Sequence, residues 1–137
     1  MDEHIVKFIK KHHLLTLATT DDDGTPYCSN AFYAFDSDSG AFIFTAGDGT
    51  RHLEQMTARP AVAASVALET RIVGRIRGVQ ICGRVIAGSS ADKALYLSRF
   101  PYAAAAGLRE VWRLEPSFIK LTDNTLGFGK KIIWTKN

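Results

Sequence analysis

Short polar turns between apolar segments are the feature that most limits how this chain can fold. Residues 14–20, 27–35 and 41–46 are rich in the β-branched and aromatic side chains typical of strands. The connections between them hold the four-residue turns 21–24 and 37–40, and each turn ends in glycine. Because such connections are too short for a crossover helix, we predict three neighbouring antiparallel strands.

The rest of the chain supplies further strands of the same kind. Apolar and β-branched residues favour strands at residues 61–68, 72–86, 111–122 and 131–135. The second of these is long enough to bend around Gly78 or Gly83. Six or seven strands in a chain of 137 residues indicate a small barrel rather than an open sheet.

Three short helices are predicted between these strands. Asp2 can cap the first helix, in which Ile5, Phe8 and Ile9 share one face, and His12 and His13 can cap its other end. The second helix covers residues 50–56 and cannot continue past a proline at position 60, and the third runs from residue 89 to 100. We therefore predict a mainly β fold, a β-barrel of six to seven mostly antiparallel strands with three short helices over its open ends, as a single domain of residues 1–137.

Charge, hydropathy and cysteine content exclude several classes of protein. The net charge of +3 is too small for an electrostatic grip on nucleic acid. The longest apolar stretches, residues 61–64 and 66–68, are far shorter than the ~20 residues of a membrane span, and the charged first residues do not resemble a signal peptide. Cys28 and Cys82 are predicted to be free, buried thiols in a reducing compartment, so we expect a cytoplasmic protein without membrane contact.

Residues 44–52 are the segment with the clearest chemistry. Phe44 and Thr45 end a strand, glycines follow, and Thr50, Arg51 and His52 begin a helix. Free N–H groups and the dipole make a helix start positive, so an arginine and a histidine there are unfavourable unless an anion is bound. A phosphate would reverse the sign of that effect. The alternative is a solvated helix start with no ligand.

The remaining candidates are weaker. The four histidines have no metal-ligand spacing, neither cysteine adjoins a histidine, and no Gly-x-Ser-x-Gly motif occurs, so no catalytic residue is assigned. A run of arginines is interpreted as a solvated strand face: Arg71, Arg75, Arg77 and Arg84. Five aromatic residues around the second and third strands are interpreted as core: Phe32, Tyr33, Phe35, Phe42 and Phe44. Phe128, flanked by glycines, fits either a plain hairpin or a loop that closes over a site or a partner subunit.

The order and spacing of several motifs resemble a known family. They are Gly24-Thr25-Pro26-Tyr27, the segment 40–45, and Thr50-Arg51-His52 placed eight residues before Pro60. Together with the segments 30–33, 76–80 and 122–131, they are similar to the YhbP-like subfamily of the FMN-binding split-barrel proteins of the pyridoxamine 5′-phosphate oxidase type. The resemblance covers nearly the whole chain.

This resemblance implies a homodimer with two FMN sites at the subunit interface. Thr45, Thr50, Arg51 and His52 match the positions that hold the FMN phosphate in the family. The second strand lies along the isoalloxazine ring in the family, which adds Ser29, Asn30 and Ala31 to the implied site. Two further residues complete the implied cofactor-binding set: Phe44 and Gln80.

The departures from the family bear on the reaction. The oxidases resembled here carry a lysine at the position of His52, a substrate-phosphate lysine at that of Ala34, and a flavin-contacting glutamine at that of Gly78. Their C-terminal Arg-x-His motif is replaced by residues 126–129. We therefore expect an FMN-dependent oxidoreductase acting on an unknown small molecule rather than a pyridoxamine phosphate oxidase.

Other functions stay open at this point. One is a non-catalytic flavin-binding module, another is a haem-handling dimer, and a third is a structural dimer without cofactor. Within the oxidoreductase hypothesis, the polar groups expected to reach the flavin face are Asn30, Tyr33 and Lys130.

Overall fold

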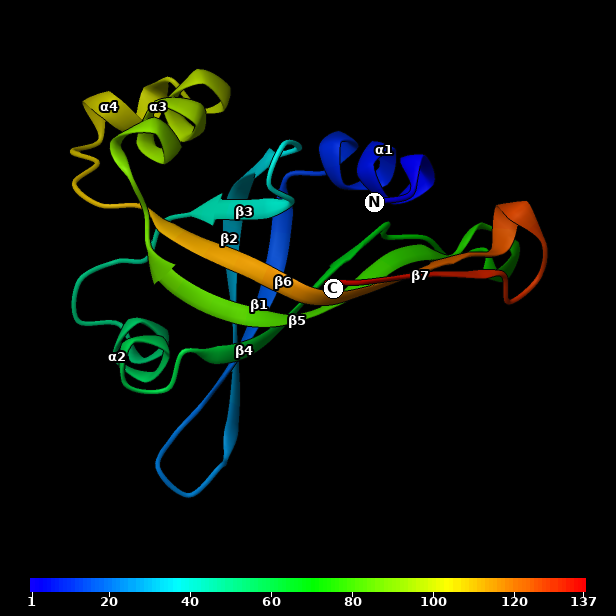
Figure 1. The fold of residues 1–137 in the computed structure, drawn as a ribbon, viewed down its shortest axis with the longest axis horizontal. Helices are drawn as coiled ribbons and strands as arrows, with labels where there is room; N and C mark the ends of the chain where they lie inside the picture. Colours follow the sequence, from blue (N-terminus) through cyan, green and yellow to red (C-terminus); the bar gives the residue numbers. More distant parts are fainter.

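The computed structural model describes residues 1–137 and shows a closed antiparallel split barrel (Figure 1). Its seven strands are β1 (Leu14–Thr20), β2 (Pro26–Asp36), β3 (Ala41–Phe44), β4 (Ala61–Ala67), β5 (Arg77–Ala87), β6 (Trp112–Asp123) and β7 (Lys131–Thr135). Their order is β3-β2-β1-β4-β5-β6-β7, and a pairing of β3 with β6 closes six of them into the barrel. Every pair is antiparallel, which the short turns predicted for β1 to β3.

The two halves of β6 have different partners. Its first residues pair with β3 and close the barrel, whereas its second half pairs with the added strand β7. The predicted bend of the long strand occurs at Gly83, where the register between β5 and β6 shifts. A side chain at Gly83 would collide with the Glu115 carbonyl group, so only glycine allows this close approach.

Four short helices, rather than the predicted three, accompany the barrel. They are α1 (Glu3–Lys11), α2 (Arg51–Ala58), α3 (Ser90–Arg99) and α4 (Tyr102–Ala105). The prediction missed α4 because it treated Pro101 only as the end of α3. The φ of Pro101, −62°, also suits the start of a new helix, so the chain turns and continues as α4.

The main core fills the barrel interior and includes residues of α1 and α2, which Figure 1 shows at the upper right and at the lower left of the barrel. Ile5, Phe8 and Ile9 of α1 are fully buried there, as their spacing predicted. The Tyr33 hydroxyl donates to the carbonyl oxygen of Ile9 at 2.6 Å and ties α1 to β2. His12 Nδ1 lies 2.9 Å from the carbonyl oxygen of Phe8, so the predicted cap at the end of α1 is also present.

A second, smaller core lies under α3, outside the barrel. Ala34 of β2 and Ile43 of β3 pack there against Tyr96 and Phe100 of α3. This cluster fixes α3 and α4 beside β2 and β3, next to the predicted phosphate-binding segment 44–52.

The predicted strand over residues 72–86 begins later than expected. Residues 72–76 leave the sheet, and Val73–Arg75 form a single 3₁₀ turn, η1. A second such turn, η2, covers Asn124–Leu126, and the Asn124 amide donates to the carbonyl oxygen of Val73 at 2.8 Å. The two turns form a projecting tip, at the right of Figure 1. No helix is long and apolar enough to cross a membrane.

Two predictions of burial were wrong. Cys28 and Cys82 are free thiols, but both are exposed. Phe32 is 47% exposed, whereas the other four aromatic residues of its predicted group are buried. All three point to the outer side of the sheet, because side chains alternate between the two faces of a strand.

Candidate functional site

The N-terminal half of β2 has an open edge. β2 pairs with β1 from Pro26 onwards, but it pairs with β3 only from Tyr33 to Asp36. The Tyr33 N–H donates to the carbonyl oxygen of His13, on the β1 side. Backbone groups alternate in an antiparallel ladder, so those of residues 28, 30 and 32 point toward the open side. A planar ligand with donors and acceptors on one edge could pair with them.

The loop of residues 45–50 runs along this open edge. It starts at the end of β3, where Phe44 pairs with Tyr33, and it ends at Arg51, whose guanidinium lies 4.8 Å from the centre of the Tyr27 ring. Tyr27 and Tyr33 are six residues apart on β2, which is about 20 Å in an extended strand. The loop and the strand edge therefore border an elongated site.

The start of α2 lies at one end of that site with its donors free. Thr50 is the N-cap residue, but its hydroxyl donates to the carbonyl oxygen of Gly47 at 2.8 Å and does not cap the helix. The backbone N–H groups of Arg51, His52 and Leu53 have no acceptor within the protein. These three donors at a helix start favour an anion.

Arg51 and His52 add their side chains at this end of the open edge. Arg51 is exposed and forms no ion pair with any carboxylate of the chain. Burial lowers the pKa of His52, because removing water disfavours the imidazolium form. His52 is therefore neutral near pH 7, and the fixed charge at this end comes from Arg51. α2 is held in place by a 2.6 Å hydrogen bond from the Thr19 hydroxyl to the Gln55 side chain.

The predicted residues of the second strand divide between its two faces. Ser29 and Ala31 pair with Leu17 and Leu15 and face the barrel interior. Asn30 faces outward, and it accepts a hydrogen bond from the Thr16 hydroxyl at 3.0 Å. Residues paired across neighbouring strands lie side by side and face the same way. Asn30 therefore belongs to an outward-facing row that crosses the sheet in the order Asn30, Thr16, Ser65 and Gln80.

A parallel outward row holds both cysteines. Register places its members side by side in the order Cys28, Ala18, Ala63 and Cys82. The two rows form an uncharged outer face of small or amide side chains across β2, β1, β4 and β5. We call it the β1–β5 outer face. Outer faces of antiparallel sheets normally carry charged or bulky polar residues, so this composition favours a covered surface.

A cavity of about 480 Å³ lies beyond the other end of the open edge. Phe32, Thr45 and Trp112 line it from the barrel, Tyr96 and Tyr102 line it from α3 and α4, and residues 106–110 close it. Thr45 thus belongs both to the loop beside β2 and to the cavity wall. No local sequence pattern connects these segments, because they come from four separate parts of the chain.

Three predicted residues do not present their side chains to the open edge of β2 in the single chain. Phe44 is fully buried in the main core and presents no side chain to the site. Tyr33 is equally buried, with its hydroxyl bonded to Ile9, so it cannot reach a flavin face. Lys130 lies at the projecting tip rather than beside the open edge of β2.

Comparison with known families now identifies the chain. A family model described as pyridoxamine 5′-phosphate oxidase matches residues 1–123. The UPF0306 protein of Photorhabdus laumondii is 40% identical over 136 residues, which cover 96% of this chain and 94% of that protein. The UPF0306 protein YhbP of Escherichia coli is 39% identical over 137 residues, with 97% and 92% covered. The chain is a YhbP-like member of the pyridoxamine 5′-phosphate oxidase family.

Solved structures with the same fold have different ligands in their names. A heme binding protein from Mycobacterium smegmatis matches this YhbP-like chain with a TM-score of 0.73 at 18% identity, covering 90% of this chain and 52% of that one. An FAD-binding protein from Mesorhizobium loti matches with 0.71 at 16% identity, covering 85% and 87%. The heme storage protein HutZ from Vibrio cholerae matches with 0.68 at 16% identity, covering 98% and 94%. Likeness at this level of identity shows the fold.

Proposed function

We propose that this YhbP-like chain binds FMN as a homodimer and acts as a flavin-dependent oxidoreductase on a small molecule other than pyridoxamine 5′-phosphate. The observation that carries the proposal is the start of α2, where three free backbone N–H groups and Arg51, which has no acidic partner, meet the open edge of β2. A bound phosphate is the group that these donors best accommodate.

The proposed phosphate ligands are Thr50, Arg51 and His52 with the free amides of α2; Thr45, which the resemblance also implied, lies at the other end of the loop, on the cavity wall. Arg51 supplies the fixed positive charge, and the neutral His52 ring can donate one hydrogen bond. Ser29 lies on the inner side of β2, two residues beyond Tyr27, where its hydroxyl can reach the same end of the site.

The proposed ring site is the open edge of β2. The free backbone groups at residues 28, 30 and 32 can pair with the donors and acceptors of a flat heterocycle, and Ala31 adds no bulk beside them. Asn30 and Gln80 are amide side chains on the β1–β5 outer face that can contact the ring from the side. When bound, FMN supplies hydride and single-electron transfer, and the protein supplies orientation and electrostatics.

The uncharged β1–β5 outer face supports a dimer. Eight small or amide side chains from four strands share this face. Its members on the two outer strands, β2 and β5, are exposed in the single chain. A second copy that covers this face would bury both cysteines and lie over Asn30 and Gln80. The flavin site would then be bordered by both subunits.

Pyridoxamine 5′-phosphate oxidation is disfavoured by three positions. Ala34 stands where the oxidases have a substrate-phosphate lysine, and it is buried under α3. At Gly78, a side chain would press to 3.1 Å of the Val66 carbonyl oxygen, so this position cannot supply the family's glutamine without a shift of the strand. Residues 126–129 replace the Arg-x-His motif with apolar and glycine residues.

Titration of the purified protein with FMN, followed by flavin fluorescence, tests the proposal. We expect saturable quenching in the micromolar range or tighter, and much weaker binding of riboflavin, which lacks the phosphate. Equal affinity for the two ligands, or no quenching by either, would overturn it.

Ala63→Arg tests the dimer, because it places a charge in the middle of the β1–β5 outer face. In analytical ultracentrifugation we expect the parent protein to sediment as a dimer and this variant as a monomer.

Haem handling is the second candidate, favoured by the names of two proteins with the same fold. Haem iron needs an axial ligand. Among the four histidines, His12 is engaged with the Phe8 carbonyl group, and His52 is the one at the proposed site. Haem binding predicts a Soret band that disappears when one histidine is replaced, with His52→Ala as the first variant to test.

A further inference from the structure

The cavity beside Thr45 is built from aromatic and apolar groups. Tyr96 is almost fully buried at its base, while Phe32 is 47% and Tyr102 61% exposed at its walls. Trp112 is half-buried between them. Exposed aromatic faces around a hollow favour a flat ligand, because aromatic rings gain from offset stacking and edge contacts.

The charged groups that line the cavity do not favour an anion, because two of the three are carboxylates. Asp48 and Arg109 pair with each other, with Nη1 and Oδ2 3.2 Å apart, and both side chains are largely in water. Glu110 is the third charged residue of the lining, and it is exposed. A ligand phosphate or carboxylate would therefore compete with Asp48 for Arg109, the one cation of the lining, beside the negative charge of Glu110.

Polar recognition in the cavity is limited to hydroxyl groups. The Thr45 and Tyr96 hydroxyl groups both line the cavity, and Thr45 partly offsets the rise that burial causes in the pKa of Tyr96. Each hydroxyl can still donate to or accept from one further group. One hydroxyl or carbonyl group on the ligand would satisfy them.

The volume sets the size of the ligand. An apolar cavity of about 150 Å³ accepts a single benzene ring, so about 480 Å³ has room for a molecule of two to three fused rings. The cavity also adjoins the proposed flavin site, since Phe32 is the outward residue that follows Asn30 on β2 and Thr45 is shared.

We infer that this cavity binds a planar, uncharged aromatic molecule of two or three rings, bearing a hydroxyl or carbonyl group, as the second ligand beside the flavin. The position beside the flavin rests on the proposed function, whereas the binding of the aromatic molecule does not. This class of ligand differs from the phosphorylated substrate of the oxidases that the chain resembles.

A matched pair of probes tests the inference. 1-Naphthol and 1-naphthyl phosphate have the same ring and differ by one phosphate group. Their dissociation constants are measured by equilibrium dialysis with flavin-free protein and with protein saturated with FMN. Ala106→Trp fills the cavity from its exposed rim, and Ala105→Trp puts the same side chain on the neighbouring residue, which is exposed and outside the cavity.

We expect 1-naphthol to bind both forms of the protein at least tenfold more tightly than 1-naphthyl phosphate. Ala106→Trp is expected to weaken 1-naphthol binding at least tenfold, and Ala105→Trp to leave it unchanged, with circular dichroism showing that both variants fold. Equal binding of the two probes, or equal effects of the two tryptophans, would overturn the inference. Displacement of 1-naphthol by FMN would also overturn it, because the cavity would then belong to the flavin site. If FMN fails to bind at all, the flavin-free measurements still decide the inference.

Discussion

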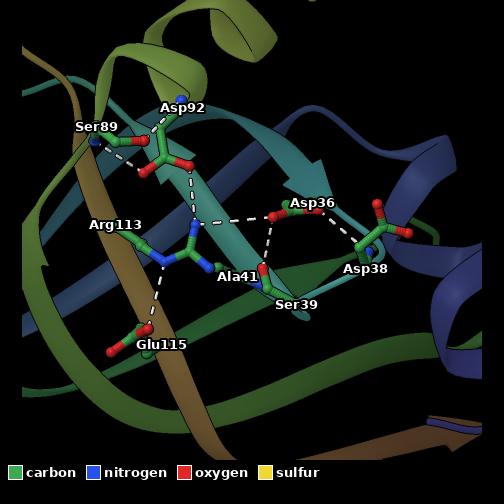
Figure 2. A network of polar contacts seen from close by, with 8 residues as sticks. All are labelled: Asp36, Asp38, Ser39, Ala41, Ser89, Asp92, Arg113 and Glu115. Atoms are coloured by element: carbon green, nitrogen blue, oxygen red, sulfur yellow. Dashed lines mark hydrogen bonds and ion pairs between the residues drawn. The ribbon is translucent and has the colours of Figure 1, made fainter.

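Two arginines of this protein stand in opposite electrostatic situations. Arg113 of β6 is 17% exposed and lies among three carboxylates, with Asp92 at 2.8 Å, Glu115 at 3.3 Å and Asp36 at 3.7 Å (Figure 2). Arg51 of α2 is exposed and has no carboxylate partner, and its guanidinium lies 4.8 Å from the centre of the Tyr27 ring. The first arginine is saturated with partners from the chain, and the second has room for an anion.

The carboxylates around Arg113 have second partners as well. Asp92 accepts from the backbone N–H of Ser89 at 3.0 Å and completes the capping box of α3. Asp36 accepts from the Ser39 hydroxyl at 2.6 Å in the turn between β2 and β3. The Arg113 network thereby joins the start of α3, one turn and β6. We infer that it stabilises the fold, whereas the free donors around Arg51 serve binding.

The largest expected effect comes from Arg113→Ala. Removing the guanidinium leaves the nearly buried Asp92 beside Asp36 without a cation, so we expect a loss of about 3 kcal/mol in the free energy of unfolding. Urea denaturation measures it. Arg113→Lys keeps the charge but not the geometry and should lose less. A change below about 0.5 kcal/mol would contradict a structural role for the network.

Arg51→Ala should show the reverse pattern. We expect FMN binding to weaken by about 2 kcal/mol, roughly 30-fold, because the phosphate loses a charged partner. The free energy of unfolding should change by less than about 0.5 kcal/mol, since an exposed side chain is removed. Fluorescence titration and urea denaturation of the same variant measure the two quantities.

Two controls sharpen this prediction. Riboflavin affinity should be equal in the parent and in Arg51→Ala, because riboflavin has no phosphate for Arg51 to bind. Arg71→Ala removes another exposed arginine, which precedes the projecting tip, and should leave FMN affinity unchanged. A loss of FMN affinity in Arg71→Ala as large as in Arg51→Ala would mean that Arg51 acts only through overall charge.

The free helix-start donors around Arg51 could be predicted from the sequence, whereas the Arg113 network could not. All the residues at the start of α2 lie within one short segment, so helix-start chemistry could be read locally. Arg113 meets its carboxylates only because β3 pairs with β6 and α3 packs beside them. Asp36, Asp92 and Arg113 are far apart in sequence, and no local pattern indicates that they meet.

The same contrast holds within the fold. Short turns determine β1 to β3, and the period-two alternation of apolar residues determines which sides face the core. Residues 72–76 were predicted as strand because Ile72, Val73 and Ile76 are β-branched, yet all three are exposed. Their conformation depends on the Asn124 side chain, which bonds the Val73 carbonyl group from a segment some fifty residues away. Interactions of this kind lie outside any sequence window.

A smaller effect is expected from His52→Lys. Burial lowers the pKa of His52 below its usual 6.5, so the parent protein lacks this charge at pH 8. A lysine supplies it permanently, and we expect FMN to bind about tenfold more tightly at pH 8, the gain of about one charged hydrogen bond. Isothermal titration calorimetry measures the change, and an unchanged affinity would exclude His52 from the phosphate site.

The pH dependence of binding tests the same residue. FMN affinity of the parent should fall as the pH rises through the His52 pKa, because the imidazolium is lost, and this fall begins below pH 6.5. The phosphate itself ionises near pH 6 and changes affinity in the opposite direction. His52→Gln keeps a donor but cannot titrate, so the ratio of the two affinities at each pH isolates His52. A ratio that does not vary with pH would contradict the assignment.

The smallest expected effect concerns Asp36, at the edge of the Arg113 network. The hydrogen bond from Ser39 holds the pKa of Asp36 below its usual 3.8, with further contributions from backbone N–H groups and from Arg113. A carboxyl whose pKa is lower in the folded state adds stability above pH 3.8 and loses it as the pH falls further. Asp36 is partly exposed, so we expect Asp36→Asn to cost less than about 1 kcal/mol at pH 7 and nothing below the folded-state pKa. Urea denaturation of both proteins from pH 2.5 to 7 measures this difference. If it stays constant over that range, Asp36 acts through hydrogen-bond geometry alone, and the charge of the network resides in Asp92 and Glu115.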